Sequence, residues 1–139
     1  MTKRYSLNPN GKELYQYRLV HVNIRGARAN KEKLMHHLSE NDFPEIVTLN
    51  ETKLGSKTRF DLPGYYSASR REVSEKGGVH GSMILVRDDI QDVVEIENFR
   101  TDFSVEVIGV EIKGNHIRPH LNVITYYNSP HNKTRQQSF

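Results

Sequence analysis

The chain has 139 residues, of which 35% are hydrophobic and none is tryptophan, a length and composition that suit one domain with a single core. It contains no cysteine, which excludes disulfides, zinc–thiolate sites and cysteine nucleophiles, and with no membrane-length apolar run or visible signal peptide we expect an intracellular location, nuclear or cytoplasmic. The net charge of +3 allows nucleic-acid binding without proving it, because basic faces are often only solvated surface.

The first predicted strand follows a start without regular structure. Residues 1–16 show no period, which indicates a flexible lead-in. Residues 17–24 alternate as a strand does, and this alternation places Leu19, His21 and Asn23 on one face.

A helix is predicted over residues 30–39. Asn30 can cap its first turn, and an apolar stripe follows, formed by Leu34, Met35 and Leu38. His36 and His37 lie beside this stripe and diverge by about 100° around the helix. They therefore cannot hold a metal ion together, and we assign them surface or packing roles.

Residues 46–50 are the central apolar run, and their β-branched residues suit a buried strand. Glu51 is the first charge after this run. A strand–helix–strand order predicts a βαβ-like unit, in which Asn23 and Glu51 lie at the same end of two strands. If these strands are neighbours, a carboxylate and an amide oxygen can share one Mg²⁺, which usually keeps several waters. Simpler roles are also open, because Glu51 can pair with Lys53 or cap a turn, and Asn23 can initiate a turn.

The rest of the sequence predicts short strands joined by loops. The expected strands are residues 66–70, 83–86, 93–96, 104–112 and 121–127. In the fourth of these, Glu106 shares a face with Ile108 and Val110. The pair Gly77–Gly78 is not a phosphate-binding fingerprint, because no helix follows it. One helix and these strands predict a mixed α/β fold, of the α+β class, with both parallel and antiparallel strands.

Five short motifs follow one another along the chain. They are V-N-I-R-G (22–26), L-N-E-T-K-L (49–54), G-Y (64–65), G-S-M-I-L-V (81–86) and V-I-T-Y-Y-N-S-P (123–130). Together they resemble the endonuclease/exonuclease/phosphatase superfamily, and most of all the AP-endonuclease-like nuclease domain of non-LTR retrotransposons. The resemblance implies that Asn23 and Glu51 bind the catalytic divalent metal, expected to be Mg²⁺. It also implies that Tyr127 lies near the scissile phosphate of DNA, with Tyr126 as the competing choice.

Candidate nucleic-acid-binding residues lie in or between these motifs. They are Arg25, Lys53, Arg70, Arg71 and Asn128. In the family that the motifs resemble, Arg70 or Arg71 matches a phosphate-facing basic position.

The resemblance covers residues 17–130 but only about the first half of the family domain, and residues 131–139 form a polar tail. It implies half of a four-layer αββα sandwich, with one mixed sheet and one main helix. The family's later Asp-x-Asn and Ser-Asp-His motifs, which orient the attacking water and stabilise the leaving group, are absent. The histidines are the only candidate bases, and surface or packing roles suit them better. We therefore expect little or no nuclease activity from this chain alone.

A half-sandwich should also leave the inner face of its sheet bare. Contiguous apolar patches rarely stay exposed, so we expect self-association or a partner protein that covers this face. Two further functions stay open besides the endonuclease: a catalytically dead relic that serves as a structural or protein-interaction module, and a module that binds nucleic acid without cutting it.

Overall fold

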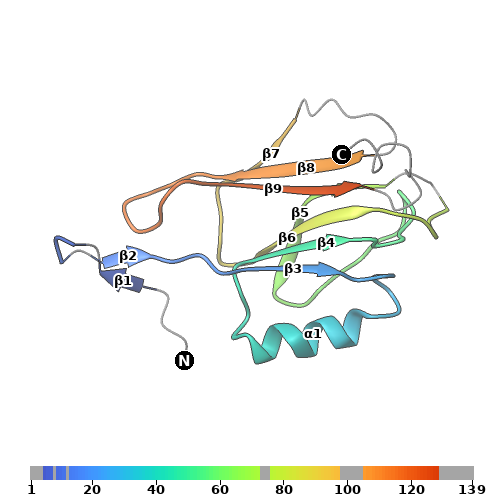
Figure 1. The fold of residues 1–139 in the computed structure, drawn as a ribbon, viewed down its shortest axis with the longest axis horizontal. Helices are drawn as coiled ribbons and strands as arrows, with labels where there is room; N and C mark the ends of the chain where they lie inside the picture. The colour runs from blue at the N-terminus through green and yellow to red at the C-terminus, as the bar shows by residue number, and fades with distance from the viewer. Residues whose placement is uncertain (1–4, 8, 12, 73–75, 98–104, 129–139) are drawn as a thin grey trace, which may run out of the picture.

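The described part of the chain forms three layers in a computed structural model that covers residues 5–7, 9–11, 13–72, 76–97 and 105–128 (Figure 1). Helix α1 (Lys31–Glu40) packs under a four-stranded sheet, and a three-stranded sheet lies over that sheet. The strands are β1 (Tyr5–Leu7), β2 (Glu13–Tyr15), β3 (Leu19–Asn23), β4 (Ile46–Asn50), β5 (Tyr65–Arg71), β6 (Ser82–Arg87), β7 (Val93–Ile96), β8 (Val105–Ile112) and β9 (Leu121–Asn128). The predicted α+β class with one main helix is confirmed, although the strands divide among three sheets instead of forming one.

The four-stranded sheet has the order β3-β4-β6-β5 and mixes parallel and antiparallel pairs. Strands β3 and β4 are parallel neighbours, with Asn23 opposite Asn50. The predicted βαβ-like unit is therefore confirmed, and the carboxyl ends of these two strands meet at one edge of the sheet.

Helix α1 covers the outer face of this sheet through its predicted apolar stripe. Leu34 and Leu38 are buried, and Met35 packs against the same core cluster. Asn30 is the N-cap residue, as predicted, and its carbonyl accepts from the Leu34 backbone at 3.0 Å. Its side chain makes no cap hydrogen bond, and its Nδ2 instead donates to the carbonyls of Ile24, Arg25 and Gly26. Asn30 thus stabilises the turn that leads from β3 into the helix.

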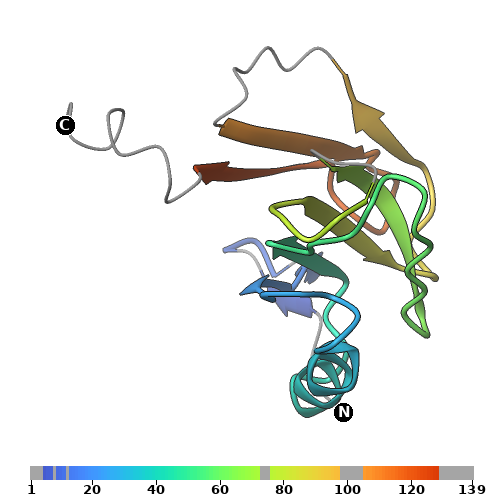
Figure 2. The ribbon, with the colours of Figure 1, turned by 90° about the vertical axis from the view of Figure 1, so that its right-hand side faces the viewer.

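The three-stranded sheet, ordered β7-β8-β9, covers most of the inner face of the four-stranded sheet (Figure 2). A second core cluster fills the space between the two sheets, formed by Ile46, Ile84, Val86, Ile90, Ile108, Val110, Ile112 and Val123. The expectation of a bare inner face is therefore wrong for most of the sheet, because the chain supplies its own second layer. Strand β3 is the exception, since Leu19 on its inner face is 49% exposed.

A small hairpin formed by β1 and β2 precedes the sandwich, in the segment expected to be an irregular lead-in. Its strands have three residues each, too few to show a period in the sequence. Tyr15 is buried under the guanidinium of Arg118, 5.0 Å from the ring centroid, and the Tyr17 hydroxyl donates to the Pro119 carbonyl at 3.0 Å. The predicted tail, residues 131–139, lies outside the described residues. No helix in the described ranges is both long enough and apolar enough to cross a membrane.

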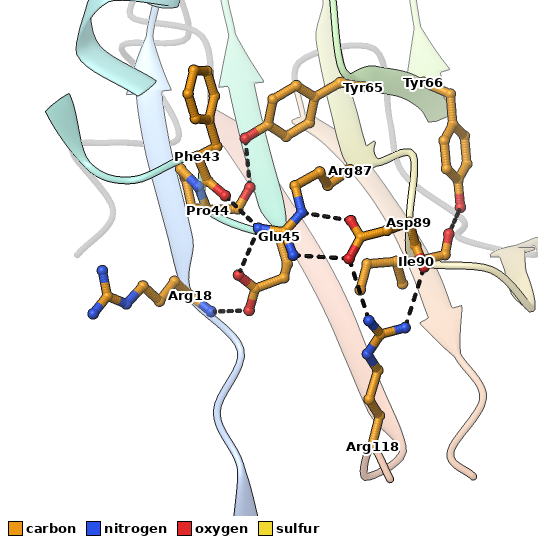
Figure 3. A network of polar contacts seen from close by, with 10 residues as sticks. All are labelled: Arg18, Phe43, Pro44, Glu45, Tyr65, Tyr66, Arg87, Asp89, Ile90 and Arg118. Atoms are coloured by element: carbon orange, nitrogen blue, oxygen red, sulfur yellow. Dashed lines mark hydrogen bonds and ion pairs between the residues drawn. The ribbon is translucent and has the colours of Figure 1, made fainter. Parts of the chain in front are cut away.

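A network of charged side chains around the buried Glu45 joins the two sheets at the start of β4 (Figure 3). Glu45 is fully buried and accepts hydrogen bonds from the backbone of Arg18 at 3.1 Å and from Arg87 at 3.4 Å. Arg87 also donates to Asp89 at 2.5 Å and 2.9 Å, and Arg118, on the β8–β9 hairpin, reaches the same carboxylate at 3.3 Å. Glu51 follows the other end of β4, so this network is structural and lies away from the predicted site.

Candidate active site

Asn23 and Glu51 meet where β3 and β4 end. The Nδ2 of Asn23 donates to Oε2 of Glu51 at 2.5 Å. Glu51 has a φ of 54°, a left-handed conformation that is uncommon outside glycine. Two backbone hydrogen bonds hold this turn, from Ile24 to the Asn50 carbonyl at 3.0 Å and from Gly26 to the Glu51 carbonyl at 2.8 Å. The two side chains predicted to converge therefore do so.

Tyr127 joins this pair from β9, in the other sheet. Burial raises its pKa to about 12, and the charge of Glu51 and a hydrogen bond with that carboxylate add to the shift. Tyr126, the competing choice, is 57% exposed, as expected for a side chain on the opposite face of the same strand. The geometry thus favours Tyr127 as the tyrosine of the site.

The oxygen atoms of this site suit a hard cation. Glu51 offers a carboxylate, and Asn23 offers its amide oxygen once the amide, whose Nδ2 faces Glu51 in the structure, is turned over. Mg²⁺ typically takes one or two protein carboxylates and completes its shell with water. The described residues contain no group of three or more His, Cys, Asp and Glu side chains of the kind that holds a more fully coordinated metal. Asn23 and Glu51 could hold Mg²⁺ as a hydrated ion.

Two residues that the sequence did not assign to the site lie beside Tyr127. Glu106, 3% exposed, accepts hydrogen bonds from the Gly81 backbone at 3.1 Å and from the Ser82 hydroxyl at 3.0 Å. Its carboxylate also lies 3.9 Å from Nδ1 of His80, whose ring centroid is 6.1 Å from that of Tyr127. The sequence offers one indication that Glu106 is buried: it shares a strand face with the apolar residues Ile108 and Val110.

The loop that carries His80 is bonded to the segment after Glu51. The backbone of Thr52 donates to the Gly81 carbonyl at 3.0 Å, and that of Lys53 donates to the His80 carbonyl at 2.7 Å. Gly78 donates in return to the Lys53 carbonyl at 2.9 Å. The two loops therefore form one rigid edge around the site.

The predicted nucleic-acid-binding residues differ in their surroundings. Arg25 and Lys53 are exposed beside Asn23 and Glu51, and Arg25 lines a groove between β3 and α1. The half-buried Arg70 forms an ion pair with Glu72 and donates to the Gly55 carbonyl. Arg71 and Arg70 line a pocket between β5 and β7. Asn128 ends β9, and its side chain lies outside the described residues. Contact with nucleic acid stays a prediction for all five.

Replacing Glu51 with glutamine is expected to lower the pKa of Tyr127 from about 12 toward 10.0, because two of the causes of the shift disappear while burial remains. The raised folded-state pKa means that the protonated phenol stabilises the fold below pH 10, and this contribution is lost as the pH rises through about 12. NMR titration of labelled tyrosine in metal-free buffer checks this. An unchanged pKa in the variant would contradict the contact.

No protein-family model and no curated protein matches the sequence. Among solved structures, the chain is similar to the AP endonuclease LMAP from Leishmania major, with a TM-score of 0.61 and 18% identity over 87% of this chain and 43% of that one. It is also similar to the 3'-5' exonuclease NExo from Neisseria meningitidis, with a TM-score of 0.53 and 21% identity over 86% of this chain and 47% of that one.

These similarities show the fold. Over 87% and 86% of its length, the chain folds like part of the AP endonuclease and part of the exonuclease. It spans less than half the length of either structure.

Proposed function

We propose that the chain is the amino-terminal part of a Mg²⁺-dependent DNA endonuclease of the retrotransposon type that its motifs resemble. The convergence of Asn23, Glu51 and Tyr127 at one edge of the sandwich carries this proposal. The two oxygen ligands suit Mg²⁺. The pKa of Tyr127, about 12, lies far above neutral pH, so its hydroxyl is protonated and can donate to a phosphate oxygen.

The distribution of charge supports DNA as the ligand. Residues 25–33 hold four cationic side chains and one carboxylate, and residues 53–61 hold three cationic side chains and one carboxylate. These two segments therefore carry more net positive charge than the whole chain, whose net charge is +3. They begin two residues after Asn23 and Glu51 and adjoin in a pocket lined by Arg28, Lys31 and Arg59. Such clustered cations beside a site attract the phosphates of nucleic acid.

Cleavage requires more than these residues supply. Hydrolysis of a phosphodiester needs an activated water and a stabilised leaving oxygen as well as a metal. The chain spans less than half of the two similar nucleases. We therefore propose that it binds metal and DNA but cuts little or no DNA alone, in a nuclear or cytoplasmic setting.

The test is titration of the chain with Mg²⁺ in a calorimeter and with a labelled DNA duplex by fluorescence anisotropy. Glu51→Gln should weaken Mg²⁺ binding by at least about tenfold, because it removes the carboxylate ligand. Glu32→Gln, an exposed carboxylate in the first turn of α1, is the matched control for the metal titration and should leave the Mg²⁺ affinity unchanged. Equal Mg²⁺ affinity of the two variants, or no binding of duplex, would overturn the proposal. Rapid nicking of supercoiled plasmid would show that the chain alone is an active nuclease.

A protein-interaction module is the second candidate, and the open edges of the two sheets favour it. In the described part of the chain no strand pairs with the outer edge of β3 or of β9. Leu19, Ile124 and Tyr126 on these strands are each about half exposed. Sedimentation velocity distinguishes the candidates: self-association without binding of Mg²⁺ or DNA supports the module, and a monomer that binds both supports the nuclease part.

A further inference from the structure

His80 lies on a loop whose position is fixed by the residues around it. Its carbonyl accepts a hydrogen bond from Lys53, and the next residue, Gly81, is bonded both to Thr52 and to the buried Glu106. A Cβ added to Gly81 would lie 2.3 Å from the Thr52 hydroxyl. The loop therefore cannot shift without disturbing the turn after Glu51, and His80 has a defined place beside the candidate site.

Two side chains from the other sheet lie beside the imidazole of His80. Glu106 of β8 lies 3.9 Å from its Nδ1, and the ring of Tyr127 on β9 lies beside it. The His80 side chain is 26% exposed, whereas that of Glu106 is 4% exposed. Because the two ring nitrogens point to opposite sides, Nδ1 faces the buried carboxylate and Nε2 is left for a ligand that arrives from solvent.

The backbone of His80 is left-handed, as are those of Glu51 and Lys53 beside it. The φ of His80, 50°, lies in a region that few non-glycine residues adopt. Conformations of this kind persist where the surrounding structure enforces them, and they cluster at ligand-binding and active sites. His80 therefore combines a left-handed backbone with a buried carboxylate and a tyrosine beside its ring.

We propose that His80 binds a phosphate of the nucleic acid that occupies the site of Asn23, Glu51 and Tyr127, with Glu106 as the positioning residue behind its ring. The inference rests on the proposed function. A protonated imidazole donates from both nitrogens, so Nδ1 faces Glu106 while Nε2 donates to a phosphate oxygen. The protonated ring of His80 then lies between two negative groups, the Glu106 carboxylate and the phosphate, and compensates both.

Anisotropy of a fluorescein-labelled 12-base-pair DNA duplex tests this inference with His80→Asn. Asparagine tolerates a left-handed backbone better than most residues, so the loop should keep its shape. We expect the duplex to bind about tenfold more weakly, the loss of one charge-assisted hydrogen bond. His36→Asn is the matched control, because His36 also lies near a glutamate, with Nε2 3.0 Å from Glu40, but on the exposed surface of α1. Its affinity should equal that of the wild type.

The outcomes separate this inference from the proposed function. Wild-type affinity in His80→Asn overturns the inference alone, whereas a wild-type chain that binds no duplex overturns both. If His80→Asn does not fold, the ring signals of His80 in ¹H–¹³C spectra of the wild type decide. A shift larger than that of His36 at saturating duplex supports the contact, and no shift overturns it.

Discussion

Replacing Arg87 with alanine is expected to lower the free energy of unfolding by about 3–5 kcal/mol, the range seen when a buried ion pair loses one partner. Arg87 donates to the fully buried Glu45, and its removal leaves this carboxylate without its cationic partner inside the protein. Asp89 and the Phe43 carbonyl lose donors in the same step. Urea denaturation followed by circular dichroism measures the effect.

Arg59→Ala is the matched control. Arg59 and Asp61 are spaced like Arg87 and Asp89, and both pairs have an N–O distance of 2.5 Å. The Arg59 pair is exposed, at 85% and 66% for the two side chains, so its loss should cost no more than about 1 kcal/mol. Similar losses in both variants would contradict a role for burial. The double variant Arg87→Met, Glu45→Leu should recover much of the stability, since it removes both charges.

The same network gives a pH dependence of known sign. Hydrogen bonding from Arg87 holds the pKa of Asp89 below its ordinary value of 3.8. The ionised carboxylate therefore stabilises the fold above that value, and this contribution is lost as the pH falls through the lower, folded-state pKa. Arg87→Ala should lose this part of the acid dependence, which denaturation between about pH 5 and pH 2 measures.

The sequence predicts those parts of the fold that depend on local pattern. The apolar stripe of α1, the alternation in β3 and β8 and the apolar run of β4 are enough to identify these elements. The order strand, helix, strand was also enough to bring Asn23 and Glu51 together, because parallel neighbours place their ends at one edge. Motif spacing and topology thus predict the core of the candidate site.

The packing of the two sheets depends on contacts between distant residues, and the sequence does not contain them as a pattern. Alternation in β8 places Glu106 with Ile108 and Val110, yet it does not show that this face is buried against β5 and β6. Val105, on the opposite face, is buried as well, so apolar residues on both faces hide which face packs against the other sheet. A carboxylate in an alternating strand usually faces solvent, so Glu106 and its neighbour His80 could not be assigned to the site from sequence.

Gly81→Ala is expected to destabilise the chain by about 2–5 kcal/mol and to disturb the candidate site. Gly81 has a φ of 97°, which an alanine adopts only under strain, and the new Cβ would lie 2.3 Å from the Thr52 hydroxyl. Relief requires movement of Thr52, which directly follows Glu51 and whose backbone donates to the Gly81 carbonyl. The hydrogen bond from Gly81 to Glu106 would move with it.

Gly78→Ala separates backbone strain from this steric overlap. Gly78 lies in the same loop with a φ of 87°, but a Cβ added there meets nothing within 4 Å. Its substitution should therefore cost only the strain of a positive φ, about 1–2 kcal/mol. Urea denaturation of both variants, together with Mg²⁺ titration, gives the comparison. An equal loss of stability in the two variants would mean that the loop adjusts freely. The loop of His80 and the turn after Glu51 would then not form one rigid edge.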